Sequence, residues 1–118
     1  PAFSHVAVVP PGATTIYVGG QNGVDATGEL VSSDVAAQSR RALENAGVAL
    51  AAAGATFADV VQWNVLLVAD ADLDAAYGAI GPMLAGPGAP ALVTAARVAG
   101  LGVPGALIEV SAIAAVLA

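Results

Sequence analysis

Several residue types on which protein chemistry often depends are absent or scarce in this chain of 118 residues. Cysteine is absent, which excludes disulfides, thiolate catalysis and cysteine metal sites. The single histidine excludes a multi-histidine metal site within one subunit. There are three arginines and no lysine, and the net charge is −6. No basic patch can be assembled from these residues, which disfavours nucleic acids and anionic membrane surfaces as partners.

Charge of either sign is scarce: 10% of the residues are charged and 58% are hydrophobic, with a mean hydropathy of +0.81. A soluble monomer normally has about a quarter of its residues charged. The long uncharged stretch 75–96 is interrupted by glycines and prolines and does not predict a membrane-spanning helix. The opening PAFSH has no signal-peptide pattern. We therefore expect one cytoplasmic domain over residues 1–118 that buries an apolar face against copies of itself.

What is present is an alternation of β-prone and helical stretches. The helices are predicted at about 34–53, between Ser32-Ser33-Asp34 and Gly54, and at about 73–84. The predicted strands are 3–9, 14–18, 60–68, 92–98 and 106–110. The order ββαβαββ predicts an α+β fold, with one mixed sheet and two helices on one of its faces. The other face then needs a partner, which again favours a homo-oligomer.

Two ionisable residues lie within predicted strands, although such residues are rare in this chain. Arg97 lies in the first strand after residue 90 and Glu109 in the second, on either side of a loop at 100–105. Glu109 is either a group that orients a hydrolytic water or a strand residue that pairs with Arg97 across a hairpin. The two interpretations carry about equal weight, since a base must lie within hydrogen-bond reach of its proton.

Other candidate groups have simpler explanations. His5 is more typical of a half-exposed strand residue than of a catalyst, since no partner for a triad can be identified. Asp70, Asp72 and Asp74 suit the cap and first turn of the second helix better than a metal site. Pro1 would act as a base only if the chain were a small tautomerase, a distant alternative. No metal or cofactor is expected.

Four segments occur together along nearly the whole chain: FSHVAVV, IYVGGQNGVDATGELV, the run from Asp34 to Ile80, and PGALIEVSAIA. As a set they closely resemble the Rid (YjgF-like) family of reactive intermediate deaminases. The resemblance implies a chorismate-mutase-like fold and a homotrimer, a trimeric barrel with three sites between subunits. Typical members hydrolyse enamines or imines to ketoacids and ammonia without a metal or cofactor.

The resemblance also implies a set of site residues. Glu109 takes the place of the family's catalytic acid, and Phe3 that of an aromatic residue that has lost its phenolic hydroxyl. Gly19 and Gly20 match the backbone of the family's SGQ segment, without its serine, and two adjacent glycines after a strand also predict a bulge or a close backbone approach. Asp74 falls where the family has an asparagine on the second helix. These residues would bind the substrate, with Glu109 orienting water.

The family's substrate-clamping arginine is missing. Its PAR(S/T) segment corresponds here to Pro90-Ala91-Leu92-Val93 with Thr94 following, so either Leu92 or Val93 takes the arginine's place. The lost contact with a substrate carboxylate is worth roughly 1.5–3 kcal/mol, a factor of about ten to a hundred in affinity. Arg97 shares a strand face with Val93 at about 13 Å and would compensate in part. We favour a solvated or interface-paired role for Arg97.

Two functions remain open from the sequence. The first is a hydrolase of an enamine, imine or related small reactive metabolite without the usual carboxylate. The second is a non-deaminating trimer of this fold that binds a small ligand or has a regulatory role. Glu109 and the segment Gly19–Gln21 favour the first, and the missing arginine favours the second.

Overall fold

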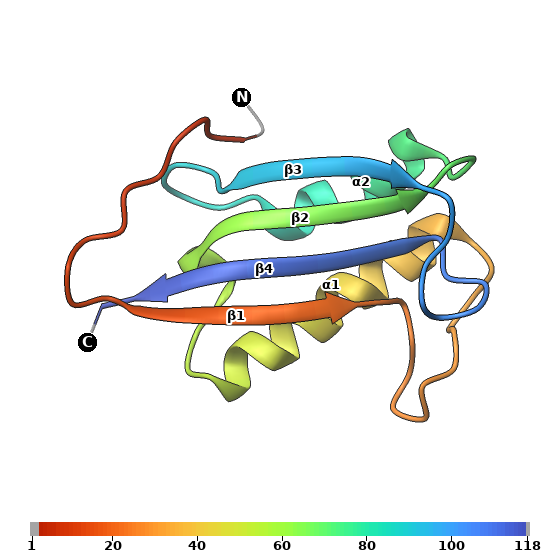
Figure 1. The fold of residues 1–118 in the computed structure, drawn as a ribbon, viewed down its shortest axis with the longest axis horizontal. Helices are drawn as coiled ribbons and strands as arrows, with labels where there is room; N and C mark the ends of the chain where they lie inside the picture. The colour runs from red at the N-terminus through yellow and green to blue at the C-terminus, as the bar shows by residue number, and fades with distance from the viewer. Residues whose placement is uncertain (1–2, 118) are drawn as a thin grey trace.

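The computed structural model describes residues 3–117 as one mixed four-stranded sheet with two helices packed on the same face (Figure 1). The sheet order is β1-β4-β2-β3, in which β2 and β3 are parallel and the other neighbours antiparallel. This confirms the predicted α+β class. Pro1 lies outside the described residues. The elements in chain order are β1 (Thr14–Gln21), α1 (Val35–Ala52), η1 (Phe57–Asp59), β2 (Val60–Val68), α2 (Leu73–Leu84), β3 (Leu92–Val98) and β4 (Ile108–Val116).

Both helices begin at an acidic cap, which is Asp72 as predicted for α2 and Asp34, instead of the predicted serine hydroxyl, for α1. The Asp34 carboxylate accepts a hydrogen bond from the Ala37 amide at 2.9 Å, and the Asp72 carboxylate accepts one from the Ala75 amide at 3.0 Å. Each bond satisfies one of the amides that a helix leaves unpaired at its first turn. Beyond α1, Gly54 takes a φ of 84°, which a glycine adopts without strain. The predicted helix ends are confirmed to within about one residue.

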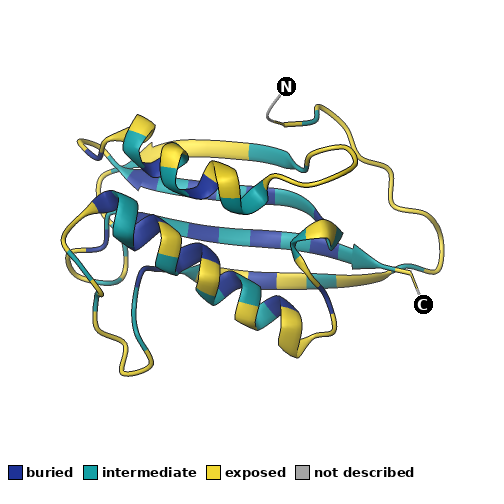
Figure 2. Ribbon diagram, turned by 180° about the vertical axis from the view of Figure 1, so that it is seen from behind, coloured by how far each residue is buried: buried dark blue, intermediate teal, exposed yellow. Residues whose placement is uncertain are grey.

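The core lies between the helices and one face of the sheet, and Figure 2 shows the alternation of buried and less buried residues along the strands. In β2, Trp63, Val65 and Leu67 are buried under the helices. The alternate residues of β2 point to the opposite face, which no helix covers. We call this second face the uncovered face. Within residues 3–117 no helix is both long and apolar enough to cross a bilayer.

The predicted strand at 3–9 is wrong for the single chain. This segment is extended but forms no strand, and its end is tied beside β3, where the Ser4 amide donates to the Ala91 carbonyl at 3.1 Å. The Ser4 hydroxyl also donates to the Pro90 carbonyl. The turn at 10–12 contains two prolines, which have no amide to donate, and Gly12 with a φ of 87°. This turn leads the segment away from β1 instead of closing a hairpin.

The predicted hairpin between the last two strands is also wrong. β2 lies between β3 and β4, so residues 99–107 form a crossover from one side of β2 to the other. The last strand is longer than the predicted 106–110 and begins two residues later, at Ile108. β3 pairs with β2 in parallel, from Gln62 opposite Leu92 to Val68 opposite Val98. The end of this crossover, where the chain enters β4, is held by α1.

The loop after β1 packs directly on α1 because Gly23 has no side chain. A Cβ at Gly23 would lie 2.6 Å from the backbone of Gln38. The buried Gln38 amide in turn donates to the carbonyls of Ser32 at 2.8 Å and Gly105 at 3.3 Å, and accepts from the Leu107 amide at 2.8 Å. Gln38 therefore joins the start of α1 to the chain that enters β4.

We expect Gly23→Ala to lower the free energy of unfolding by about 1–3 kcal/mol, the usual cost of overpacking against rigid backbone. Gly78→Ala in α2 is the matched control, because a Cβ there meets no atom within 4 Å. In a helix that change stabilises by about 0.5–1 kcal/mol. Urea unfolding followed by circular dichroism measures both. Equal midpoints for Gly23→Ala and the parent chain would contradict the close packing.

Candidate functional site

The side chains of the uncovered face follow from the strand register, since residues directly opposite each other point to the same side. β2 and β4 are the two central strands, and their side chains on the uncovered face lie side by side. Glu109 lies opposite Leu66, Ser111 opposite Asn64, and Ile113 opposite Gln62. Acidic, polar and apolar side chains therefore succeed one another along β4, about 7 Å apart.

Glu109 lies over a β-bulge in the neighbouring strand. The register between β1 and β4 shifts between Val18 and Gln21, which places the two residues of Gly19–Gly20 opposite Ser111. A Cβ at Gly20 would lie 2.6 Å from the Glu109 Cδ and 2.7 Å from its Oε2. The absent side chain at Gly20 is therefore the space that the carboxylate occupies. The glycine pair was predicted to form a bulge or a close approach, and the structure shows both.

Polar side chains continue from this carboxylate across three strands. The Gln62 Nε2 donates to Asn64 Oδ1 and to Thr94 Oγ1, both at 3.4 Å. Asn64 also lies opposite Ser111 on its other side. We call Gln62, Asn64, Thr94 and Ser111 the polar row. It lies on the same face as Glu109 and directly beside it.

Of the polar row, only Thr94 was predicted as a site residue, because it follows the segment in which the family has its arginine. Gln62 and Asn64 stood out only as polar interruptions in an apolar strand. Their spacing of two residues was the available signal, because it places both on one face of a strand. What the sequence lacked was the strand order, which brings Ser111 and Thr94 to either side of Asn64.

Arg97 lies on the opposite, helix-covered side of the sheet, opposite Leu67 of β2. Its Nη1 donates to the carbonyl oxygens of Ala71 at 2.9 Å, Ala69 at 3.0 Å and Val68 at 3.4 Å. Arg97 therefore holds the loop between β2 and α2. The predicted alternative in which it pairs with Glu109 is wrong, because β2 separates the two strands and the side chains point to opposite faces.

Two further predicted site residues lie on that helix side. Val93 is opposite Trp63 and packs against the core, and Asp74 is exposed in the first turn of α2. Tyr77 of the same helix is partly buried, and this burial raises the pKa of its hydroxyl. Tyr77 and Arg97 line a cavity of about 130 Å³ between α2 and β3. The sheet separates all of these groups from Glu109.

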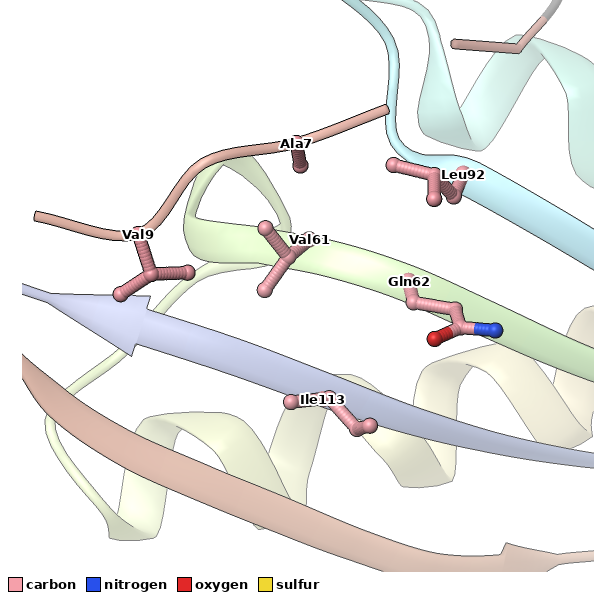
Figure 3. Close-up of a pocket in the computed structure, with 6 residues that line it drawn as sticks. All are labelled: Ala7, Val9, Val61, Gln62, Leu92 and Ile113. Carbon is pink, nitrogen blue, oxygen red and sulfur yellow. The ribbon is translucent and has the colours of Figure 1, made fainter. Parts of the chain in front are cut away.

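Leu92, unlike Val93, points to the uncovered face, opposite Gln62. It lines an open cavity of about 150 Å³ between the sheet and the N-terminal segment (Figure 3). The six residues that line this cavity are Ala7, Val9, Val61, Gln62, Leu92 and Ile113. Of the two positions that could replace the family's arginine, only Leu92 therefore shares a face with Glu109. Along the strand direction the two are four residues apart, about 13 Å, and β2 lies between their strands, so their backbones are about 16 Å apart.

Phe3 is exposed and its ring packs edge-on against His5, with 5.6 Å between ring centroids. The adjacent Ser4 is bonded beside the start of β3, so Phe3 is remote from Glu109 within one chain. The structure thus brings Glu109, Gly19 and Gly20 together, with Thr94 and Leu92 on the same face. It does not bring Phe3, Asp74, Val93 or Arg97 to them.

This fold is that of a known family. The family model described as endoribonuclease L-PSP matches residues 1–116. The chain therefore belongs to this family, which is the Rid (YjgF) family of the sequence resemblance. The human 2-iminobutanoate/2-iminopropanoate deaminase is 50% identical over 54 residues, 45% of this chain and 39% of the human protein. The rat protein of the same name is 45% identical over 67 residues, 56% of this chain and 47% of its own.

The chain thus matches less than half the length of these curated relatives, whereas solved structures match it nearly throughout. A Rid-family protein of Yersinia pestis is 36% identical with a TM-score of 0.85, over 98% of this chain and 87% of its own. RidA of an Antarctic Psychrobacter is 32% identical with a TM-score of 0.76, over 93% and 92%. The predicted Rid fold is confirmed.

We expect Gly20→Ala to displace the Glu109 carboxylate, since the distance from Cβ to Cδ must rise from 2.6 Å to an ordinary contact of 3.4 Å or more. Gly19→Ala is the matched control, because a Cβ there meets nothing within 4 Å and neither glycine has a positive φ. Crystal structures of both variants measure the shift. An unmoved Glu109 in Gly20→Ala would show that the glycine has another role.

Proposed function

We propose that this chain forms a homotrimer that hydrolyses a small uncharged imine or enamine in clefts between its subunits. The observation that carries the proposal is the Glu109 carboxylate, which lies over Gly20 on the uncovered face of the sheet. Relatives named as imine deaminases and the family membership support the reaction class.

The uncovered face itself favours assembly. It carries apolar side chains without a helix to cover them, including Leu66, Leu92, Ile113 and Tyr17, whose side chain is 76% exposed. Only 10% of the residues of this chain are charged, which is few for a protein surface wholly in water. Copies of the chain that pack on this face would bury the apolar residues and place Glu109 in a cleft rather than in open solvent.

The chemistry requires one acid and one water. Glu109 orients a water against the imine carbon and takes a proton as the new C–O bond forms and the electron pair of the C=N bond moves to nitrogen. Glu109 gives that proton to the nitrogen to form the neutral carbinolamine, then takes the hydroxyl proton and passes it to the nitrogen as the C=O bond forms. The C–N bond breaks, and a carbonyl compound and ammonia are released. An enamine first takes a proton at carbon to reach the same imine.

The charges around Glu109 disfavour an anionic substrate. Arg97 points to the helix side, and Arg40 and Arg41 belong to α1. None of the three arginines of the chain lies on its own uncovered face. A substrate carboxylate near Glu109 would meet a like charge with no clamp, so an uncharged imine is favoured.

The non-deaminating alternative has its own observation. Leu92, one of the two positions that replace the family's arginine, lies on the uncovered face and is apolar. A neutral ligand would bind beside it without being hydrolysed. The family description also names an endoribonuclease. We do not propose that activity, because a chain with net charge −6 and without lysine offers no surface for phosphates.

We expect Glu109→Gln to lower imine hydrolysis by roughly 10²–10⁴-fold, the usual contribution of a positioned base. Imines released by a flavin amine oxidase from neutral primary amines, and by an amino acid oxidase from amino acids, are trapped with semicarbazide. The parent chain should reduce semicarbazone formation most for the neutral imines. Glu29→Gln, in the exposed loop after β1, is the control. Semicarbazone formation that the parent chain leaves unchanged for every imine would favour the ligand-binding alternative.

We expect Leu92→Arg to restore preference for carboxylate-bearing imines, because it places a guanidinium on the face of Glu109. The ratio of kcat/KM for amino-acid imines to that for neutral imines should rise about ten- to a hundredfold. Leu92→Gln, which adds polarity without charge, is the control. Val93→Arg should instead destabilise the fold, since Val93 packs against the core. An unchanged ratio in Leu92→Arg would refute a clamp at this position.

A further inference from the structure

We propose that the polar row binds an uncharged carboxamide group of the ligand and so defines the substrate class. This inference rests on the proposed function, because it supplies the part of the substrate that Glu109 does not contact. The substrate would carry a carboxamide close to its imine carbon, where the family's usual substrates carry a carboxylate.

The position of the row suits a small ligand. Glu109 and Ser111 are two residues apart on β4, about 7 Å, and Asn64 lies opposite Ser111. Asn64 and Glu109 are therefore diagonal neighbours on one face, about 7–8 Å apart at their backbones, and long side chains close that gap. A ligand of a few heavy atoms, with its imine carbon at Glu109, would place a neighbouring amide within reach of Asn64.

The hydrogen bonds already made within the polar row determine which donor and acceptor atoms remain for a ligand. Gln62 Nε2 is engaged with both Asn64 Oδ1 and Thr94 Oγ1. Among the bonds of residues 3–117, Asn64 Nδ2 remains as a donor, Gln62 Oε1 as an acceptor, and the Ser111 hydroxyl as either. A carboxamide matches this pattern with one carbonyl oxygen and two N–H groups, whereas a carboxylate can only accept.

These atoms are open to a ligand. No buried side-chain polar atom in the described part of the chain lacks a hydrogen-bond partner, so the unbonded atoms of the row are reached by solvent. Glu109 is the acidic neighbour of the row, and no arginine lies on this face. Exchange of a carboxylate for an isosteric carboxamide removes the like-charge repulsion and adds a donor for Gln62 Oε1 or Ser111 Oγ.

Pyruvamide and pyruvate test the proposal, because they have nearly the same shape and differ in charge and in hydrogen-bond donors. Each is titrated into ¹⁵N-labelled protein, and binding is followed by the side-chain amide signals of Asn64 and Gln62. Pyruvamide should shift these signals and bind about tenfold or more tightly than pyruvate. Asn64→Leu, which keeps the volume, should weaken pyruvamide binding roughly three- to tenfold, the effect of one or two neutral hydrogen bonds.

Thr15→Val is the matched control, because Thr15 lies on the same face of β1, opposite Ala115 and outside the row. It should leave pyruvamide binding unchanged. Equal or tighter binding of pyruvate would overturn the proposal. So would an Asn64→Leu protein that binds pyruvamide normally but is a smaller oligomer by light scattering, since the row would then be a subunit contact.

The titration needs no turnover, so its outcome is separate from that of the hydrolysis assay. Binding of pyruvamide that depends on Asn64, in a protein that hydrolyses no imine, supports the carboxamide site and refutes the deaminase. Hydrolysis of neutral imines that depends on Glu109, without preference for pyruvamide, refutes the carboxamide site and leaves the deaminase in place.

Discussion

The structure depends on one constraint: the two helices cover one face of a four-stranded sheet, and no helix of residues 3–117 covers the other. Since strand residues alternate between faces, each strand contributes one set of side chains to the core and another to the uncovered face. In β4 the first set includes Ile108 and Val110, which are buried, and the second includes Glu109 and Ser111. Stability within one chain comes from the first set, and the candidate site is built only from the second.

Much of the fold could be predicted because its signals are local. Asp34 and Asp72 cap the helices through bonds to amides three residues away, and the bounds of β2 and β3 were predicted to the residue. The glycine pair, which lies within β1, predicted a bulge because few other residues tolerate such a close approach. The resemblance to the family predicted that Glu109 takes the place of the family's catalytic acid. Its contact with Gly20 came from the structure.

The features that could not be predicted depend on the order of the strands in the sheet, which no single segment of the sequence determines. Arg97 and Glu109 lie on consecutive strands and were taken as partners across a hairpin, but β2 lies between them. The extended segment at 3–9 has the composition of a strand, yet it is bonded beside β3 and not beside β1. The polar row assembles from three strands, so Gln62 and Asn64 alone gave no sign of Thr94 or Ser111 as neighbours.

The contrast between Leu92 and Arg97 shows why a site on an uncovered face can change while the fold stays the same. Leu92 and Arg97 are five residues apart on one strand, so their side chains point to opposite faces of the sheet. Arg97 binds loop carbonyls on the helix side, and Leu92 lies on the face of the candidate site. Loss of the clamp at Leu92 removes no core contact, because the core uses the other set of residues. No arginine of the chain lies on that face, and in the function proposed above the neighbouring amides and hydroxyls select the ligand. In that proposal Glu109, without a neighbouring cation, favours a substrate that carries no charge of its own.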